Sequence, residues 1–267
     1  MRVQNQACTA ITMTDCQTLP TNLYPDSEDV HVWWASLSPS RRDITSWMVP
    51  LSADERDRAD RYRFERDRAR FVVGRGLLRI LISRYLDLAP RQVQFAYGPY
   101  GKPSLAGAED DLTFSLAHSD DLAVYAFSRK RDIGVDLEYV RPLEDMGDIA
   151  ARFFSPDEAA ALAALPQPQQ LDVFYHIWTC KEAYLKALGA GLSLPLDAFD
   201  VAVNPQEPAR LLRVGLDRSD EPGRWTLLRL ASREHYAAAL SVNGPVARIV
   251  RRASDVTHRL TDVTFGG

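Results

Sequence analysis

Apolar and polar positions along the chain alternate with the period of strands and then of helices, and this order occurs twice. Residues 30–37 form a run of β-branched and aromatic residues, which predicts a first strand. Ser52 followed by Glu55 matches a capping box and predicts the start of a long helix, whose apolar face ends at Ile82. Gly74 and Gly76 weaken the middle of this helix or mark the close approach of another element.

The remaining elements complete two similar sets. Strands are expected at 93–97, 113–117, 122–127 and 133–140, helices at 146–153, 156–165 and 171–188, and strands at 199–203, 225–230 and 236–242. Strand, helices and strands therefore follow one another twice, which predicts an α+β fold of two similar halves. The expected division is a flexible leader (1–29), an N-terminal half (30–130), a C-terminal half (131–245) with the metal site at the interface, and a tail (246–267).

Composition narrows the class of protein. The chain has 267 residues, of which 46% are hydrophobic and 25% charged, which is enough to build a sizeable core. A net charge of −4 and a pI near 5.8 give no support to nucleic-acid or anionic-membrane binding. The three cysteines form no CxxC pair, and no apolar signal or membrane-spanning run is found. These features predict a soluble, cytoplasmic protein.

Two segments present carboxylates at suggestive spacing. Asp136 and Glu138 lie two apart on an expected strand and so face the same side, opposite Val135 and Leu137. Adjacent carboxylates repel, and a cation between them makes the arrangement favourable. Glu182 and Lys186 lie four apart on an expected helix and share a face. Taken alone, a solvated edge strand and an ordinary surface ion pair explain these segments better.

Two further segments carry weaker signals. A strand ends in His118 and Ser119, and a loop punctuated by Gly101 and Pro103 presents Lys102. A lone histidine or a lone loop lysine is usually just a surface residue, so neither segment is specific by itself.

The ordered combination of these segments is specific. A Gly-x-Asp-x-Glu strand from Gly134, followed by Trp-x-x-Lys-Glu-Ala-x-x-Lys from Trp178, resembles the signature of 4′-phosphopantetheinyl transferases. Gly-Lys-Pro, Phe-Ser-Leu-Ala-His-Ser, Arg-Phe-Phe-Ser and Gly-Leu-Ser-Leu-Pro-Leu segments, which begin at residues 101, 114, 152 and 191, fit the same family. The match covers roughly residues 30–243 and is similar to the Sfp-type branch. This resemblance implies a pseudo-dimer of two α+β halves, each with a small, mostly antiparallel sheet packed on a long helix.

The resemblance also implies a reaction. The 4′-phosphopantetheine arm of coenzyme A would move to a serine of an apo acyl or peptidyl carrier protein, with release of adenosine 3′,5′-bisphosphate. Asp136, Glu138 and Glu182 would hold Mg²⁺, with Mn²⁺ as an alternative, because hard cations favour carboxylate and phosphate oxygens. Glu182, acting directly or through a metal-bound water, would be the base for the serine hydroxyl. Lys186 would stabilise or protonate the departing oxygen.

Contacts to coenzyme A follow from the same resemblance. Lys102 with Pro103, His118, Arg70, Lys186 and, more weakly, Arg58 would face the nucleotide and its phosphates. The sequence departs from the family pattern at Ala117, where a serine is common, and at Glu55, where a basic residue is expected. Both departures affect recognition of the 3′-phosphate.

The carrier protein would dock beside the segment from Gly189 to Phe199. Leu192, Leu194 and Leu196 are its apolar candidates there, and core packing explains these leucines equally well. A monomer suffices, since both halves lie in one chain. The carrier could belong to fatty-acid, polyketide or nonribosomal-peptide biosynthesis, or to a lysine pathway.

Three other interpretations remain. Residues 54–75 contain eight arginines, but six acids are interleaved with them, so intrahelical ion pairing accounts for the charge better than nucleic-acid binding does. A Mg²⁺-dependent phosphodiesterase acting on a pyrophosphate could use the same carboxylates with water as the nucleophile. A non-catalytic, carrier-binding homologue is the third, and the intact set of carboxylates argues against it.

Overall fold

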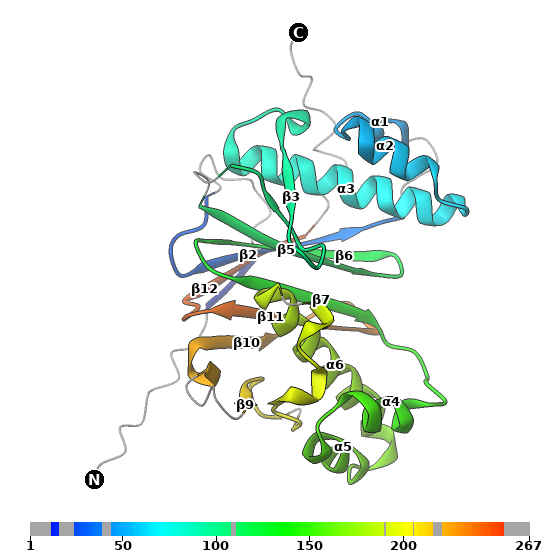
Figure 1. Cartoon of the computed structure of the whole chain (residues 1–267), viewed down its shortest axis with the longest axis vertical. Coiled ribbons are helices and arrows are strands. Elements are labelled where there is room, and N and C mark those ends of the chain that lie inside the picture. The colour runs from blue at the N-terminus through cyan, green and yellow to red at the C-terminus, as the bar shows by residue number, and fades with distance from the viewer. Residues whose placement is uncertain are drawn as a thin grey trace.

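A computed structural model of the chain describes residues 12–15, 24–38, 44–107, 111–189, 191–204, 206–215 and 221–253. Two sheets stack face to face in the middle of the molecule, with helix α3 on the outer side of one sheet and helix α6 on the outer side of the other (Figure 1). Each sheet with its helix forms one half. The predicted α+β fold of two halves is confirmed.

The first half contains most of the elements up to residue 129. They are β2 (Asp29–Ser36), α1 (Ile44–Met48), α2 (Ala53–Asp60), α3 (Glu65–Leu86), η1 (Pro90–Gln92), β3 (Phe95–Tyr97), β4 (Pro103–Leu105), β5 (Leu112–Ser119) and β6 (Leu122–Arg129). Its sheet has the strand order β1-β12-β2-β6-β5. β1 (Thr12–Asp15) lies in the predicted leader and β12 (Arg248–Ala253) in the predicted tail, and both pair in parallel within this sheet. The boundaries expected from the sequence stay predictions.

The second half contains β7 (Ile133–Tyr139), α4 (Met146–Phe153), α5 (Pro156–Ala163), α6 (Gln167–Leu188), η2 (Gly191–Ser193), η3 (Leu196–Ala198), β8 (Phe199–Val201), β9 (Leu211–Val214), η4 (Glu221–Arg224), β10 (Trp225–Arg229) and β11 (Tyr236–Asn243). β7 is the edge strand of the antiparallel order β10-β11-β7. The helices and strands expected here are confirmed, and the short β9 was not expected. Within the described ranges, none of the helices combines the length and apolar character that crossing a bilayer requires.

The long helix expected from Ser52 is wrong as a single element, because the chain breaks between α2 and α3. Ser52 does begin a helix, and its backbone N–H donates to Glu55 at 3.0 Å, which is half of the expected capping box. The Glu55 carboxylate then accepts from Arg75 and from Arg79, both at 2.5 Å. In one straight helix, residues 20 apart would be separated by about 30 Å. The fold-back of α2 onto α3 is what brings these charges together.

The two sheets meet along β5 and β7. Val135 and Leu137 are buried in the apolar cluster between the sheets, as the strand alternation predicts. The Ser115 hydroxyl accepts from the Val135 backbone N–H at 3.1 Å, and the Ser119 hydroxyl accepts from that of Tyr139 at 3.0 Å. Two hydroxyls four residues apart on β5 therefore satisfy two amides four apart on the edge strand β7.

Candidate active site at the seam between the halves

Gly134 allows helix α6 to lie directly on strand β7. A Cβ at Gly134 would stand 2.0 Å from the carbonyl oxygen of Ala183 and 2.3 Å from the backbone nitrogen of Ala187. Only a residue without a side chain permits this approach. Asp136 and Glu138 follow Gly134 on the same face of β7, so they lie against the α6 face that carries Glu182 and Lys186. The backbone contact thus sets the position of all four side chains.

Asp136 is the most enclosed member of this group. Its side chain is 5% exposed, and one of its oxygens, Oδ1, accepts from the Lys186 ammonium at 2.6 Å. The other oxygen, Oδ2, is buried and has no hydrogen-bond partner among the described residues. A solvated edge strand is therefore excluded for Asp136, since α6 covers this face of β7. A buried carboxylate oxygen without a partner is costly and indicates a ligand.

The pKa values of Glu138 and Glu182 are both affected by the negative charge of Asp136. Burial first, and then the Asp136 carboxylate, raise the pKa of Glu138 above its ordinary value. The same two causes, in the same order, raise the pKa of Glu182. The Ser119 hydroxyl donates to Glu138 Oε2 at 3.1 Å and fixes its orientation. Mutual repulsion of this kind is relieved when a cation enters.

The fit of this cluster to a metal ion rests on its chemistry and on the unpartnered Asp136 oxygen. Three carboxylates supply the hard oxygen ligands that Mg²⁺ prefers. As they stand, however, no three His, Cys, Asp or Glu side chains among the described residues are gathered closely enough to hold an ion. Lys186 instead neutralises Asp136. The predicted role of Asp136, Glu138 and Glu182 as metal ligands stays a prediction.

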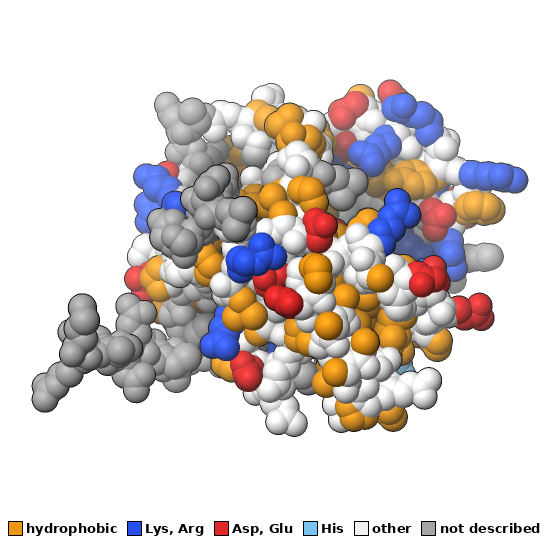
Figure 2. Space-filling model, turned by 60° about the horizontal axis from the view of Figure 1, so that its bottom comes forward, with side chains coloured by type: hydrophobic (Ala, Val, Ile, Leu, Met, Phe, Trp, Pro, Cys, Tyr) orange, Lys and Arg blue, Asp and Glu red, His pale blue; other side chains and the backbone are white. Residues whose placement is uncertain are grey.

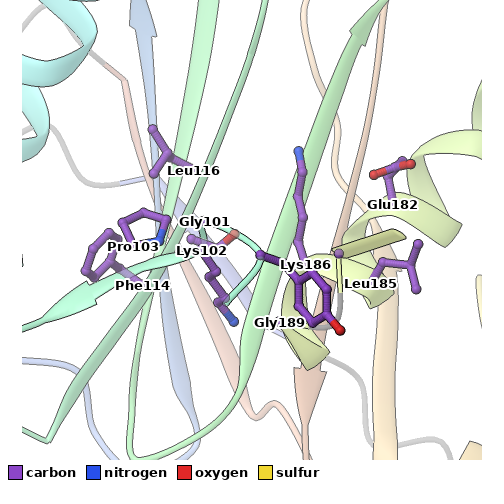
Figure 3. A pocket seen from close by; sticks show the side chains of 12 residues that line it. Gly101, Lys102, Pro103, Phe114, Leu116, Glu182, Leu185, Lys186 and Gly189 are labelled. Atoms are coloured by element: carbon purple, nitrogen blue, oxygen red, sulfur yellow. The ribbon is translucent and has the colours of Figure 1, made fainter. Parts of the chain in front are cut away.

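Two cavities meet beside this cluster. The smaller, of about 300 Å³, is mainly apolar and is lined by β5, by the loop between β3 and β4, and by the last turns of α6. Figure 3 shows Glu182, Leu185 and Lys186 entering it from α6, and Phe114 and Leu116 from β5. The larger, of about 770 Å³, is the more polar of the two and lies against α2, α3 and the end of β5. Pro103 and Lys186 line both cavities, so the Lys186 side chain stands at their junction.

The larger cavity, called the polar cleft below, collects five of the six residues that were predicted to contact coenzyme A: Arg58, Arg70, Pro103, His118 and Lys186. Desolvation by the cleft walls, together with the Lys186 and Arg70 cations, lowers the pKa of His118, so its imidazole is neutral at pH 7. Its ring nitrogens can then donate or accept a proton at the cleft surface.

The two predicted arginine contacts in the cleft, Arg58 and Arg70, differ in how far protein groups engage them. Arg70 donates to Asp120 at 2.5 Å and to Asp121 at 2.6 Å, so nearby carboxylates largely neutralise its guanidinium. Arg58 lies over the Phe71 ring at 5.0 Å, and the described residues give it no carboxylate partner. Arg58, which was the weaker candidate, is therefore the more available cation for a phosphate.

Lys102, the sixth candidate, lies apart from the polar cleft. It lines the smaller cavity, and its ammonium donates to the backbone carbonyls of Ile133 at 3.1 Å and Ala187 at 2.9 Å. Burial lowers the pKa of Lys102, although Asp132 opposes the shift. The structure therefore places Lys102 with Pro103 and Lys186 at the smaller cavity, but not with Arg58, Arg70 and His118 in the polar cleft.

The two departures from the family pattern have structural explanations. Glu55 is 4% exposed and turns toward Arg75 and Arg79, so it presents no carboxylate to the cleft. Ala117 is buried beside the cleft and faces the same way as Ser115 and Ser119 on β5. A methyl group therefore stands where a third hydroxyl would face β7.

The expected docking segment from Gly189 to Phe199 follows α6 and contains the short helices η2 and η3. Leu196 is buried and Leu194 packs on the core cluster of α6, so core packing explains both. The side chain of Leu192 lies outside the described residues. Docking of a carrier protein at this segment stays a prediction.

Sequence reasoning missed Lys181, which precedes Glu182. Its side chain is 0% exposed and its ammonium contacts Glu158 at 2.7 Å, the Leu196 carbonyl at 2.7 Å and the Phe199 carbonyl at 2.5 Å. A lysine inside a run of apolar helical residues was a signal that could have found it, since buried lysines are rare unless paired. Lys181 thus holds the segment at Leu196 and Phe199 against helix α6.

The arginine-rich helices do not form a basic stripe. Arg68 pairs with Asp60 at 3.1 Å, and Arg70 is held by Asp120 and Asp121. On the face seen in Figure 2, blue and red side chains are interspersed among apolar ones. Ion pairing accounts for Arg68, Arg70 and Arg75, but their shortest pairs join α3 to other elements rather than lying within one helix as expected. Arg58 has no carboxylate partner among the described residues.

Comparison with known proteins is consistent with this fold and site. The family model described as the 4′-phosphopantetheinyl transferase superfamily matches residues 132–241, and the model of the N-terminal part of 4′-phosphopantetheinyl transferases matches residues 34–130. The 4′-phosphopantetheinyl transferase HetI of Nostoc sp. is 41% identical over 227 residues, which cover 84% of this chain and 92% of HetI. The 4′-phosphopantetheinyl transferase Sfp of Bacillus subtilis is 37% identical over 150 residues, 56% of this chain and 65% of Sfp.

Among solved structures, the holo-[acyl-carrier-protein] synthase of Neisseria meningitidis resembles 42% of this chain and 96% of that protein, with 19% identity and a TM-score of 0.35. A TM-score at this level supports no conclusion about the site.

The protein is built from two α+β halves, with an acidic cluster beside a cleft of about 770 Å³. The chain belongs to the 4′-phosphopantetheinyl transferase superfamily and is of the Sfp type.

Proposed function

We propose that this chain transfers the 4′-phosphopantetheine arm of coenzyme A to a serine of an apo carrier protein, in a Mg²⁺-dependent reaction. The observation that carries the proposal is the buried, unpartnered oxygen of Asp136, which lies beside Lys186 at the junction of the two cavities. A diphosphate bound at this junction would place its nucleotide in the polar cleft. Family membership supplies the substrate class.

Asp136, Glu138 and Glu182 are the residues that would hold the cation. When bound, Mg²⁺ supplies charge neutralisation for the diphosphate and makes the reacting phosphorus a better electrophile. Its binding would also remove the repulsion that raises the pKa values of Glu138 and Glu182.

The proton of the attacking serine needs an acceptor on this chain. Glu182 has a raised pKa, which places a carboxylate closer to the operating pH and improves it as a general base. In the proposed step, the serine oxygen forms a bond to the β-phosphorus of coenzyme A while its proton passes to Glu182. The bond from that phosphorus to the bridging oxygen breaks, and adenosine 3′,5′-bisphosphate leaves. The Lys186 ammonium stabilises the negative charge that develops on the departing oxygen.

The two cavities differ in polarity, and each suits a different part of coenzyme A. The polar cleft, with Arg58 and His118 on its walls, suits the adenosine and its 3′-phosphate. The smaller, apolar cavity beside Leu185 suits the pantetheine arm, which is long and largely uncharged.

A mass measurement tests the proposal. The protein is incubated with coenzyme A, Mg²⁺ and a panel of apo carriers from fatty-acid, polyketide and nonribosomal-peptide systems, and the carriers are weighed. A carrier heavier by one phosphopantetheine is expected, and chelation of the metal should abolish the gain. Release of free 4′-phosphopantetheine, with the carrier unmodified, would instead indicate the Mg²⁺-dependent phosphodiesterase.

The Glu182→Gln variant separates binding from proton transfer. Removal of a general base is expected to lower kcat by about 10²–10⁴-fold. Binding of adenosine 3′,5′-bisphosphate to the polar cleft, measured without Mg²⁺, should change little, since Glu182 does not line that cleft. A variant that keeps the full rate would eliminate Glu182 as the base.

A further inference from the structure

Lys102 joins both halves of the molecule through one ammonium group. The residue lies in the loop between β3 and β4 of the first half, whereas its two acceptors belong to the second half. Ile133 is the first residue of β7, and Ala187 lies in the last turn of α6. The Lys102 ammonium donates to the carbonyls of both, at 3.1 Å and 2.9 Å.

The Ala187 carbonyl is one of the acceptors that a helix leaves open. The last four carbonyls of an α-helix have no partner within the helix, and a cation near them also meets the negative end of the helix dipole. α6 ends at Leu188, and Gly189 follows in the left-handed conformation. Lys102 therefore caps the C-terminus of α6 from the opposite half of the protein.

A phosphate contact would compete with this arrangement. To reach the polar cleft, the ammonium would have to leave two carbonyls and the half-buried position that the side chain now occupies. A buried acceptor left without its donor costs about 1–3 kcal/mol. The stem of the side chain passes close to Gly189, since a Cβ added there would lie 3.3 Å from Lys102 Cδ.

We propose that Lys102 is a positioning residue, a latch between the halves that fixes the last turn of α6 against the loop before β4. The expected effect of this latch on kcat rests on the proposed function. Lys186 is adjacent to Ala187 and lines both cavities, and Gly101 and Pro103, on either side of Lys102, also line both. The latch thus sets the width of the junction where the diphosphate would lie and holds Lys186 there.

The test compares Lys102→Met with Lys130→Met. Methionine keeps the apolar stem and removes the donors, while Lys130 is a surface lysine of the same half, 71% exposed and paired with Asp111. Three quantities are measured in the full chain: amide hydrogen exchange, the Kd for adenosine 3′,5′-bisphosphate, and kcat with a carrier protein.

The latch predicts a specific pattern for Lys102→Met. Amides in the last turn of α6 and in the β3–β4 loop should exchange at least tenfold faster, kcat should fall at least tenfold, and Kd should change less than threefold. Lys130→Met should match the wild type throughout. Should Lys102→Met fail to fold, Lys102→Gln, which keeps an N–H donor, is measured in the same way.

Two results would overturn the proposal. A tenfold weaker Kd with a reduced salt dependence and unchanged exchange would make Lys102 a phosphate ligand. If amide hydrogen exchange and kcat of Lys102→Met both equal those of the wild type, Lys102 does not stabilise the contact between the halves. If the wild type modifies no carrier, the proposed function fails, whereas the exchange comparison still decides whether the latch exists.

Discussion

Gly134→Ala provides the sharpest perturbation of the site, because it adds one methyl group exactly where α6 meets β7. The new Cβ would stand 2.0 Å from the Ala183 carbonyl oxygen and 2.3 Å from the Ala187 nitrogen. Both atoms belong to the backbone of a 22-residue helix, so no side-chain rotation can relieve the contact. The helix must move away from the strand.

The required movement can be estimated from the structure. Ordinary contact begins near 3.4 Å, so the helix must retreat by about 1.4 Å from its present 2.0 Å. The Lys186–Asp136 contact at 2.6 Å would lengthen toward the limit of a hydrogen bond. Overpacking of this kind costs about 1–3 kcal/mol of stability, and a misplacement of about 1 Å at a reacting centre can cost about 10²-fold in rate.

The assay combines thermal unfolding with the carrier-mass assay. Gly134→Ala is expected to lower Tm by about 2–4 °C for each kcal/mol lost and to reduce kcat by about 10²-fold, while binding of adenosine 3′,5′-bisphosphate is retained. Gly147→Ala is the matched control, since a Cβ there meets nothing within 4 Å in helix α4. That change should be neutral or stabilise by up to about 1 kcal/mol. A Gly134→Ala enzyme with normal Tm and rate would refute the contact as the determinant of the site.

Two further predictions follow from buried charge. Lys181→Met leaves the buried Glu158 carboxylate without its cation, with only the backbone N–H groups of Ser155 and Val201 as donors among the described residues, so unfolding by denaturant should show a loss of about 3–5 kcal/mol. Adding Glu158→Gln should recover part of this loss, and a Lys181→Met variant of unchanged stability would disprove the pairing. The raised pKa values of Glu138 and Glu182 mean that folding favours their protonated forms, so the stability linked to these groups is present at low pH and is lost as pH rises through their folded pKa values. Mg²⁺ binds the deprotonated forms and should therefore raise Tm more at pH 7.5 than at pH 5, by thermal shift against a chelator; an equal effect at both pH values would argue against these ligands.

Local patterns in the sequence predicted most of the elements because each has a clear period or a cap. The alternation around Val135 and Leu137 identified the strand and its buried face, and Ser52 with Glu55 marked a true helix start. The break between α2 and α3 was not predictable in this way, since the partners that Glu55 meets across it, Arg75 and Arg79, lie 20 and 24 residues further along the chain.

The site shows the same division between local and distant information. The face shared by Asp136 and Glu138, and that shared by Glu182 and Lys186, follow from spacing along one element. That Lys186 pairs with Asp136 rather than with Glu182 depends on how α6 lies on β7, which spacing does not contain. Lys102 illustrates the limit, because its acceptors are backbone carbonyls and leave no signature in the sequence.

The site is divided between the two halves, so contacts between the halves should affect kcat of the proposed transfer. The acidic cluster and Lys186 come from β7 and α6, whereas the polar cleft is walled largely by α2, α3 and β5. Neither half alone presents both the acidic cluster and the polar cleft, so under the proposed function the reacting diphosphate would lie where the two halves meet. Ser115, Ser119 and Lys102 reach across that seam from the first half, and Gly134 sets the depth of α6 on the second. Changes at Ser115, Lys102 and Gly134, which do not line the polar cleft, should therefore alter kcat more than nucleotide affinity.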